Sequence, residues 1–191
     1  MTLREGNATG ELKLLSREVL YTGRVIDLLV DRVEYPSGRP GIREIARHPG
    51  GAVTVPLLDD GRVILVTQLR YPVGMRVTEL PAGKLSPGEP PLSAAARELA
   101  EETGYAASSF EHLATVYTTP GFCDEELHIY LARGLAPLPG GARREEGELN
   151  MTLELIPFSD AVARASGGGF ADAKTIIGLL LAEKRLGGNT R

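Results

Sequence analysis

Cysteines and long apolar runs are scarce in this sequence, and each scarcity excludes a class of protein. The 191 residues include one cysteine, Cys123, so an internal disulfide framework is excluded and a reducing cytoplasm is favoured. No apolar run approaches the roughly 18 residues that a membrane span requires. Residues 1–11 contain no apolar core of the kind a signal peptide needs. We therefore predict a cytoplasmic protein with no membrane partner.

Histidine is also rare, and none of the three is placed for zinc. His48, His112 and His128 have no histidine or cysteine partner at zinc-ligand spacing, so we interpret them as surface or strand-packing residues. Residues 83–84 read Gly-Lys but lack the glycine spacing and the following Ser or Thr of a phosphate-binding P-loop.

The overall charge and composition indicate an ordinary globular chain. A formal net charge of -4 argues against non-specific binding of nucleic acid. With 42% hydrophobic residues over this length, one domain, or one domain with a small extension, can bury a substantial core.

The pattern of apolar residues predicts strands followed by late helices, a mixed α/β (α+β) layered fold. Turn residues separate most of these segments, and the polar stretch 137–147 reads as a loop. The predicted strands are 12–22, 24–35, 41–48, 52–58, 62–70, 77–80, 112–119, 125–133 and 151–156, and the predicted helices are 92–103, 159–165 and 171–185.

Residues 83–105, GKLSPGEPPLSAAARELAEETGY, carry the strongest local signal. The prolines at 90–91 suit the first turn of a helix, and Gly104 suits a left-handed stop. At about 100° per residue, one apolar stripe is expected. Its predicted members are Leu92, Ala95, Ala96, Leu99 and Thr103.

Three glutamates adjoin that stripe. Glu98, Glu101 and Glu102 would raise one another's pKa unless a cation neutralised them. Arg97, four residues before Glu101, can hold its carboxylate in a charge-assisted hydrogen bond. Spacing alone leaves a second interpretation open, a solvated acidic helix face.

The whole segment resembles the Nudix hydrolase box in every defining position, G-x5-E-x7-R-E-L-x-E-E-x-G-Y. The resemblance implies a strand-loop-helix that binds Mg²⁺, or Mn²⁺ as a substitute, and cuts a nucleoside diphosphate linked to another group. It also implies an α/β/α sandwich with a mixed sheet over residues 49–191. A small N-terminal antiparallel sheet over residues 1–48 is expected to serve dimerisation and the substrate pocket.

Sequences flanking the box resemble the ADP-ribose pyrophosphatase branch of the family. They are QLRY at 68–71, ELPAGK at 79–84 and YTTPG at 117–121, with Pro120 sixteen positions beyond Gly104. This branch implies hydrolysis of ADP-ribose to AMP and ribose 5-phosphate. Pro120 is expected to mark the substrate class, although a proline after a strand can also be an ordinary turn.

Family resemblance assigns the roles in the box. Glu98 and Glu102 are the expected main metal ligands, and Glu101 is a further or bridging ligand. The backbone carbonyl of Ala82 completes the ligand set. Arg97 is expected to orient these ligands rather than bind substrate.

A water-activating residue is expected on the loop after the box. In this branch of the family an acidic loop residue assists the metal or the water, and Glu146 and Glu148 are the candidates here. The other interpretation is an acidic surface loop balanced by Arg143 and Arg144.

Substrate contacts are expected from the strands around the box. Arg70 could grip a phosphate bidentately, or form a surface salt bridge, and Glu79 could accept hydrogen bonds from a ribose or base. By resemblance, Tyr21, Arg24 and Arg43 belong to an adenosine pocket that this family often builds across a homodimer interface.

Two classes of function stay open at this point. The first is an enzyme for ADP-ribose or for another nucleoside diphosphate derivative, such as GDP-mannose, another nucleotide sugar, FAD or NADH. The second is a nucleotide-sensing module without turnover. Because all the defining carboxylates of the box are present, the sequence favours the enzyme.

Overall fold

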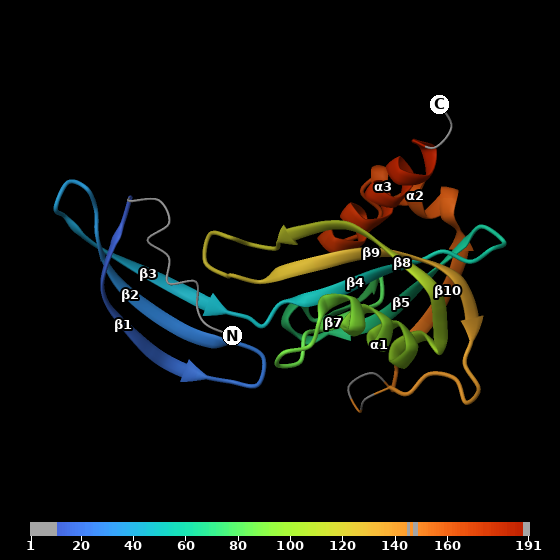
Figure 1. The fold of residues 1–191 in the computed structure, drawn as a ribbon, viewed down its shortest axis with the longest axis horizontal. Coiled ribbons are helices and arrows are strands. Elements are labelled where there is room, and N and C mark those ends of the chain that lie inside the picture. Colours follow the sequence, from blue (N-terminus) through green and yellow to red (C-terminus); the bar gives the residue numbers. More distant parts are fainter. Residues whose placement is uncertain (1–10, 145, 147–148, 189–191) are drawn as a thin grey trace.

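The computed structural model describes residues 11–144, 146 and 149–188. Its N-terminal strands form a separate antiparallel sheet in the order β1-β2-β3, which projects from the rest of the molecule (Figure 1). Leu29 and Val33 on the central strand are buried, whereas every residue of β1 is exposed. The strands are β1 (Lys13–Thr22), β2 (Asp27–Glu34) and β3 (Pro40–Arg47).

Two sheets make up the body of the molecule. One is mixed, in the order β7-β4-β9-β8, with β4 and β9 parallel and the other pairs antiparallel. The second is antiparallel, in the order β10-β5-β6. The strands are β4 (Gly51–Pro56), β5 (Arg62–Arg70), β6 (Met75–Glu79), β7 (Ala82–Lys84), β8 (Tyr105–Tyr117), β9 (Glu126–Pro137) and β10 (Thr152–Pro157), with the short 3-10 helix η1 (Tyr71–Val73) between β5 and β6.

Helices cover the mixed sheet on both faces, as Figure 1 shows. Strand β4 is buried throughout because its alternating side chains face two different helices. Val53 and Val55 belong to the main core with Leu179 of α3, whereas Ala52 packs with Ala95 of α1. The helices are α1 (Pro91–Thr103), α2 (Phe158–Ser166) and α3 (Ala173–Gly187). The α/β/α sandwich expected from the sequence is therefore present.

Most predicted elements are present, with two differences. Strands β8 and β9 are longer than expected, because they form one extended hairpin joined over many residue pairs. The predicted apolar stripe of α1 is partly wrong: Leu92 and Ala96 are exposed, and Ala94 and Glu102 are buried instead. The helix packs its small residues, not its first leucine, against β4.

Within the described ranges, no helix is long and apolar enough to cross a membrane. The division of the chain at residue 48 stays a prediction.

Candidate active site

Strand β7, the loop after it and α1 form the strand-loop-helix of the box. Pro91 occupies the first helical turn, where its missing N–H costs nothing. Gly104 ends the helix in the left-handed region, at φ 76°, and its N–H donates to the carbonyl oxygen of Ala100 at 3.0 Å. Helix α1 lies beside β7, with Glu98 and Glu102 next to Gly83 and Ala82.

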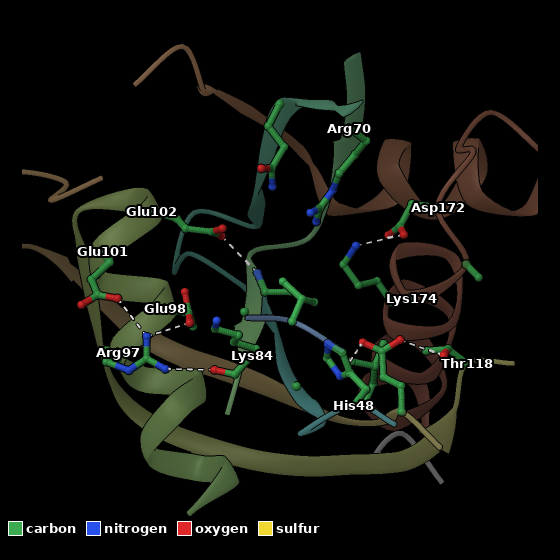
Figure 2. Close-up of a pocket in the computed structure, with 18 of the residues that line it drawn as sticks. His48, Arg70, Lys84, Arg97, Glu98, Glu101, Glu102, Thr118, Asp172 and Lys174 are labelled. Atoms are coloured by element: carbon green, nitrogen blue, oxygen red, sulfur yellow. Dashed lines mark hydrogen bonds and ion pairs between the residues drawn. The ribbon is translucent and has the colours of Figure 1, made fainter. Parts of the chain in front are cut away.

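The helix carboxylates reach back to that strand. Glu102 is 1% exposed, and its Oε2 accepts a hydrogen bond from the backbone N–H of Ala82 at 3.1 Å (Figure 2). Glu98 lies so close to Gly83 that a Cβ on residue 83 would overlap its carboxylate. The strand and the helix can approach this closely only because residue 83 has no side chain.

Arg97 ties three acidic side chains together. Its Nε and Nη2 donate to the two oxygens of Glu89, both at 2.9 Å. Its Nη1 donates to Glu98 at 2.7 Å and to Glu101 at 3.0 Å, and Nη2 also reaches the carbonyl of Lys84 at 3.2 Å. Arg97 therefore links the loop before the helix to the two helix glutamates, and its role in orienting metal ligands stays a prediction.

The same contacts shift two pKa values. The hydrogen bonds from Arg97, with a further bond from the Ser86 backbone, lower the pKa of Glu89 to about 2. The bond to Glu89 raises the pKa of Arg97, and burial only partly opposes this. Both groups are charged at neutral pH, and each stabilises the other's charge.

A cationic wall lies across the cavity from α1. Arg70, from the end of β5, donates Nε and Nη2 to the two oxygens of Glu79, both at 2.8 Å. Lys174, from the first turn of α3, also bonds Glu79 and contacts Asp172 at 2.9 Å. Burial alone would lower the pKa of Arg70, but hydrogen bonding and the charge of Glu79 raise it.

One cavity of about 660 Å³ separates the two walls. This volume is within the range typical of small-molecule sites, roughly 300–1,000 Å³. Figure 2 shows Arg70 and Lys174 on one side, with the helix glutamates and Arg97 on the other. Gln68, Ala82 and Gly83 also line it.

The residues of the acidic wall fit a divalent metal by their chemistry. Their donors are carboxylate oxygens and the Ala82 carbonyl, which hard cations such as Mg²⁺ prefer. Glu98, Glu101, Glu102 and Ala82 all line this cavity. In the part of the chain that the structure describes, no three acidic, histidine or cysteine side chains converge as a metal-binding group, and Glu98 and Glu101 both accept hydrogen bonds from Nη1 of Arg97.

The structure brings together the predicted box residues and Arg70, but it disperses the other expected substrate contacts. Glu79 lies behind Arg70, not on the cavity wall. The pairing of Glu79 with two cations leaves it enclosed, so direct contact with a ribose or base is not supported by this geometry. Pro120 lines neither this cavity nor the second one described below.

The N-terminal candidates lie outside the main cavity. Arg43 donates to the hydroxyl of Tyr35 at 2.9 Å and lies over its ring, and Tyr21 is 60% exposed. Arg24 lines a second cavity of about 640 Å³, between the N-terminal sheet and the body. The two cavities share Val25 and His48 in their linings.

The loop candidates are placed only in part. Glu146 is exposed, and Glu148 lies outside the described residues. The described root of the loop contacts α1. Arg144 donates to the carbonyls of Glu102 at 3.0 Å and Met151 at 2.6 Å, and the interpretation of this loop as an acidic surface balanced by Arg143 and Arg144 stays a prediction.

Sequence reasoning missed several residues of the cavity wall. His48, interpreted above as a packing residue, lies 3.4 Å from Glu125 through its Nδ1, and Thr118 donates to Glu125 at 2.8 Å. His48, Thr118 and Glu125 line the main cavity, as do Lys174 and Asp172. Nothing in their local sequence pattern indicates this, because strand ends and a helix start far apart in the chain bring them together.

Comparison with known proteins identifies the family. A model of the Nudix domain matches residues 48–175, so the chain belongs to the Nudix hydrolase family. An ADP-ribose pyrophosphatase of Bacillus subtilis is 40% identical over 165 residues, covering 86% of this chain and 89% of the relative. A methanol dehydrogenase activator of Bacillus methanolicus is 39% identical, covering 87% and 90%. An ADP-ribose pyrophosphatase of Mycobacterium tuberculosis is 38% identical, covering 91% and 84%.

A solved structure of an ADP compounds hydrolase has the same fold. The TM-score is 0.82, with 20% sequence identity, over 95% of this chain and 97% of that chain. Nudix hydrolases generally require a divalent metal and act on small nucleotide derivatives, which agrees with the acidic wall of the cavity.

Proposed function

We propose that this protein hydrolyses the pyrophosphate bond of ADP-ribose to AMP and ribose 5-phosphate, with Mg²⁺ as its metal. The observation that carries the proposal is the cavity in which the box carboxylates face Arg70 and Lys174. A pyrophosphate is polyanionic. Its hydrolysis therefore requires that the charge of its phosphate oxygens be neutralised and that the pyrophosphate be held in a fixed orientation. The relatives named ADP-ribose pyrophosphatase support this choice of substrate.

The acidic wall is proposed to hold the metal. Glu98, Glu102 and the Ala82 carbonyl would be its main ligands, and Glu101 a further one. Bound Mg²⁺ supplies charge neutralisation of phosphate oxygens and a more acidic water. The contribution of Arg97 is orientation, since it fixes the positions of Glu98 and Glu101 from a single guanidinium.

The cationic wall is proposed to orient the substrate. Arg70 uses one edge of its guanidinium to bind Glu79, and its remaining N–H groups are available for a phosphate oxygen. Arg24 is proposed to contact the nucleoside, since the second cavity that it lines adjoins the main one. Tyr21, Arg43 and Pro120 stay candidates from family resemblance alone.

The proton acceptor is proposed to come from the loop after β9. Glu146 and Glu148 are the two candidates, and the described root of this loop is attached to the end of α1 that carries Glu101 and Glu102. A Glu148→Gln variant should lose turnover far more than substrate affinity. Equal turnover in the variant and the parent would reject Glu148.

A homodimer is proposed from the exposed apolar side chains of the N-terminal sheet. Leu15, Val19, Leu20 and Tyr21 on β1 are each about half exposed or more, at 48%, 52%, 53% and 60%. An exposed strand of this kind is usually covered by another surface. Sedimentation at micromolar concentration should give twice the chain mass, and a monomer would reject the proposal. We also propose a cytoplasmic location, which the free thiol of Cys123 supports.

The decisive experiment is product analysis with purified protein and Mg²⁺ or Mn²⁺. The substrate panel contains ADP-ribose, GDP-mannose, FAD and NADH, and Glu102→Gln is the inactive control. AMP and ribose 5-phosphate from ADP-ribose, lost in the control, would support the proposal. Preferential cleavage of another compound would support the hydrolase activity but reject ADP-ribose as the substrate. No turnover of any compound would favour a nucleotide-sensing role.

A further inference from the structure

A charged cluster at the start of α3 joins the last helix to the cavity wall. We call Arg70, Glu79, Asp172 and Lys174 the α3 cap cluster. Glu79 receives hydrogen bonds from both cations, and Asp172 holds Lys174 at 2.9 Å. Asp172 is also the N-cap of α3, since its Oδ2 accepts from the backbone N–H of Thr175 at 3.0 Å.

Two members of this cluster are largely buried, so an unpaired charge among them would be energetically costly. The side chain of Glu79 is 1% exposed and that of Lys174 is 11% exposed, whereas that of Arg70 is 42% exposed. A buried carboxylate is strongly destabilised when it loses one of its cations. Lys174 therefore supplies one of the two cations that pair with the buried Glu79, and Arg70 supplies the other.

Glu79 determines which way Arg70 points. Its two oxygens take the Nε and Nη2 edge of the guanidinium in a planar bidentate pair. That pairing fixes the plane of the group and leaves Nη1 on the other edge. Figure 2 shows the Arg70 side chain extending from its strand toward the cavity.

Thr175, in the first turn of α3, also links the helix to the segment after Glu79. The Oγ1 of Thr175 accepts from the backbone N–H of Leu80 at 2.8 Å and donates to Asp172 at 2.6 Å. Leu80 lies two residues before Ala82, which lines the cavity beside the acidic wall. The first turn of α3 therefore fixes the position of Leu80, which lies between Glu79 at the end of β6 and Ala82 at the start of β7.

We infer that Lys174 is a positioning residue for substrate binding, which acts through Glu79 to aim Arg70 at the anionic part of the substrate. The cluster contains two cations and two carboxylates, and Lys174 contacts both of the carboxylates. Its effect is on the direction of Arg70. The inference deepens the proposed function, because it depends on that function for the identity of the anion.

The test compares Lys174→Met and Lys174→Arg with Lys184→Met, a control on the exposed face of the same helix. Steady-state kinetics with ADP-ribose give KM and kcat separately. Lys174→Met should raise KM about tenfold and change kcat less than about threefold, since a lost orienting contact weakens binding before chemistry. Lys174→Arg should restore most of the affinity, because it also places a cation against Glu79.

A second readout does not depend on the substrate. The NMR signal of the Arg70 Nε–H, assigned by its loss in Arg70→Lys, reports the bond to Glu79. It should shift or broaden in Lys174→Met and recover in Lys174→Arg, with Lys184→Met unchanged. If Lys174→Met does not fold, Lys174→Gln takes its place.

The outcomes separate the two proposals. A parent enzyme that does not cut ADP-ribose overturns the proposed function, and the NMR signal then decides the role of Lys174 alone. An unmoved Arg70 signal overturns the positioning role. With an active parent, an unchanged KM, or a fall in kcat at constant KM, overturns it as well.

Discussion

The carboxylate of Glu98 occupies the space that a side chain on Gly83 would fill. A Cβ built on Gly83 would overlap the carboxylate carbon and both of its oxygens. Gly83 does not have a positive φ, so the backbone there does not require glycine. Close approach of helix and strand is therefore the physical reason for glycine at the first position of the box.

Gly83→Ala should lower the activity of the enzyme while leaving it folded. The added methyl group would displace the Glu98 carboxylate, and misplaced metal ligands commonly cost about 10–100-fold in activity or metal affinity. Turnover as a function of Mg²⁺ concentration measures this. Gly187→Ala is the matched control, because a Cβ there meets no described atom within 4 Å. Equal losses in both variants would refute the explanation.

Arg97→Gln should reduce turnover more than it reduces stability. Its side chain holds Glu98 and Glu101 as well as Glu89, so its loss releases two candidate metal ligands at once. We expect a fall in kcat of about 10–100-fold, with a raised Mg²⁺ requirement. Arg97→Lys should recover little, because an ammonium group cannot reproduce three planar hydrogen-bonding directions. Full activity in Arg97→Lys would show that charge alone suffices.

Glu89 should make the folded state sensitive to acid. Its pKa is lowered from 4.5 to about 2 in the folded protein, by Arg97 first and then by the Ser86 backbone. A lowered folded-state pKa contributes stability that is fully present above the unfolded pKa and is lost as the pH falls from about 4.5 through about 2. Urea unfolding of parent and Glu89→Gln should therefore differ at pH 7 and converge toward pH 2. A constant difference across that range would contradict the assignment.

The site could be predicted from sequence where it is local. Residues 83–105 fold as one strand-loop-helix, so the spacing of Glu98, Glu101 and Glu102 predicts that they lie close together on the helix, and the resemblance to the Nudix box predicts that they form one wall of a site. The burial of Glu102 could not be predicted in this way. It follows from the position of β7, whose Ala82 N–H gives the carboxylate a partner.

The other wall of the cavity depends on contacts between distant segments. Lys174 meets Glu79 across 95 positions of the chain, and His48, just after β3, meets Glu125, just before β9. No periodicity links such residues, because the packing of α3 and the β8–β9 hairpin on the body determines their positions. Helix α3 comes close enough because Gly178 packs against Leu80, where a Cβ would lie 2.6 Å from a methyl carbon.

Gly104 ends α1 and also receives the loop after β9. Its carbonyl accepts from the N–H of Leu138 at 2.7 Å, and the N–H of Arg143 donates to the carbonyl of Glu101 at 2.9 Å. A Cβ on Gly104 would lie 2.7 Å from the backbone nitrogen of Ala142. The helix end that carries the candidate metal ligands therefore also fixes the root of the loop that carries the candidate base.

Gly104→Ala should accordingly destabilise the protein more than the same substitution at a glycine that only ends a helix. Gly74 provides the comparison, since it ends η1 at a similar φ of 65° but has no atom within 4 Å of a built Cβ. Gly74→Ala should lower the free energy of unfolding by about 1–2 kcal/mol, which is the cost of a left-handed conformation for a residue with a side chain. Gly104→Ala has that cost and also displaces the loop, so urea unfolding should show a clearly larger decrease in its free energy of unfolding. Its kcat should fall as well. Equal losses of stability in the two variants, with kcat unchanged in Gly104→Ala, would mean that the loop does not depend on this contact.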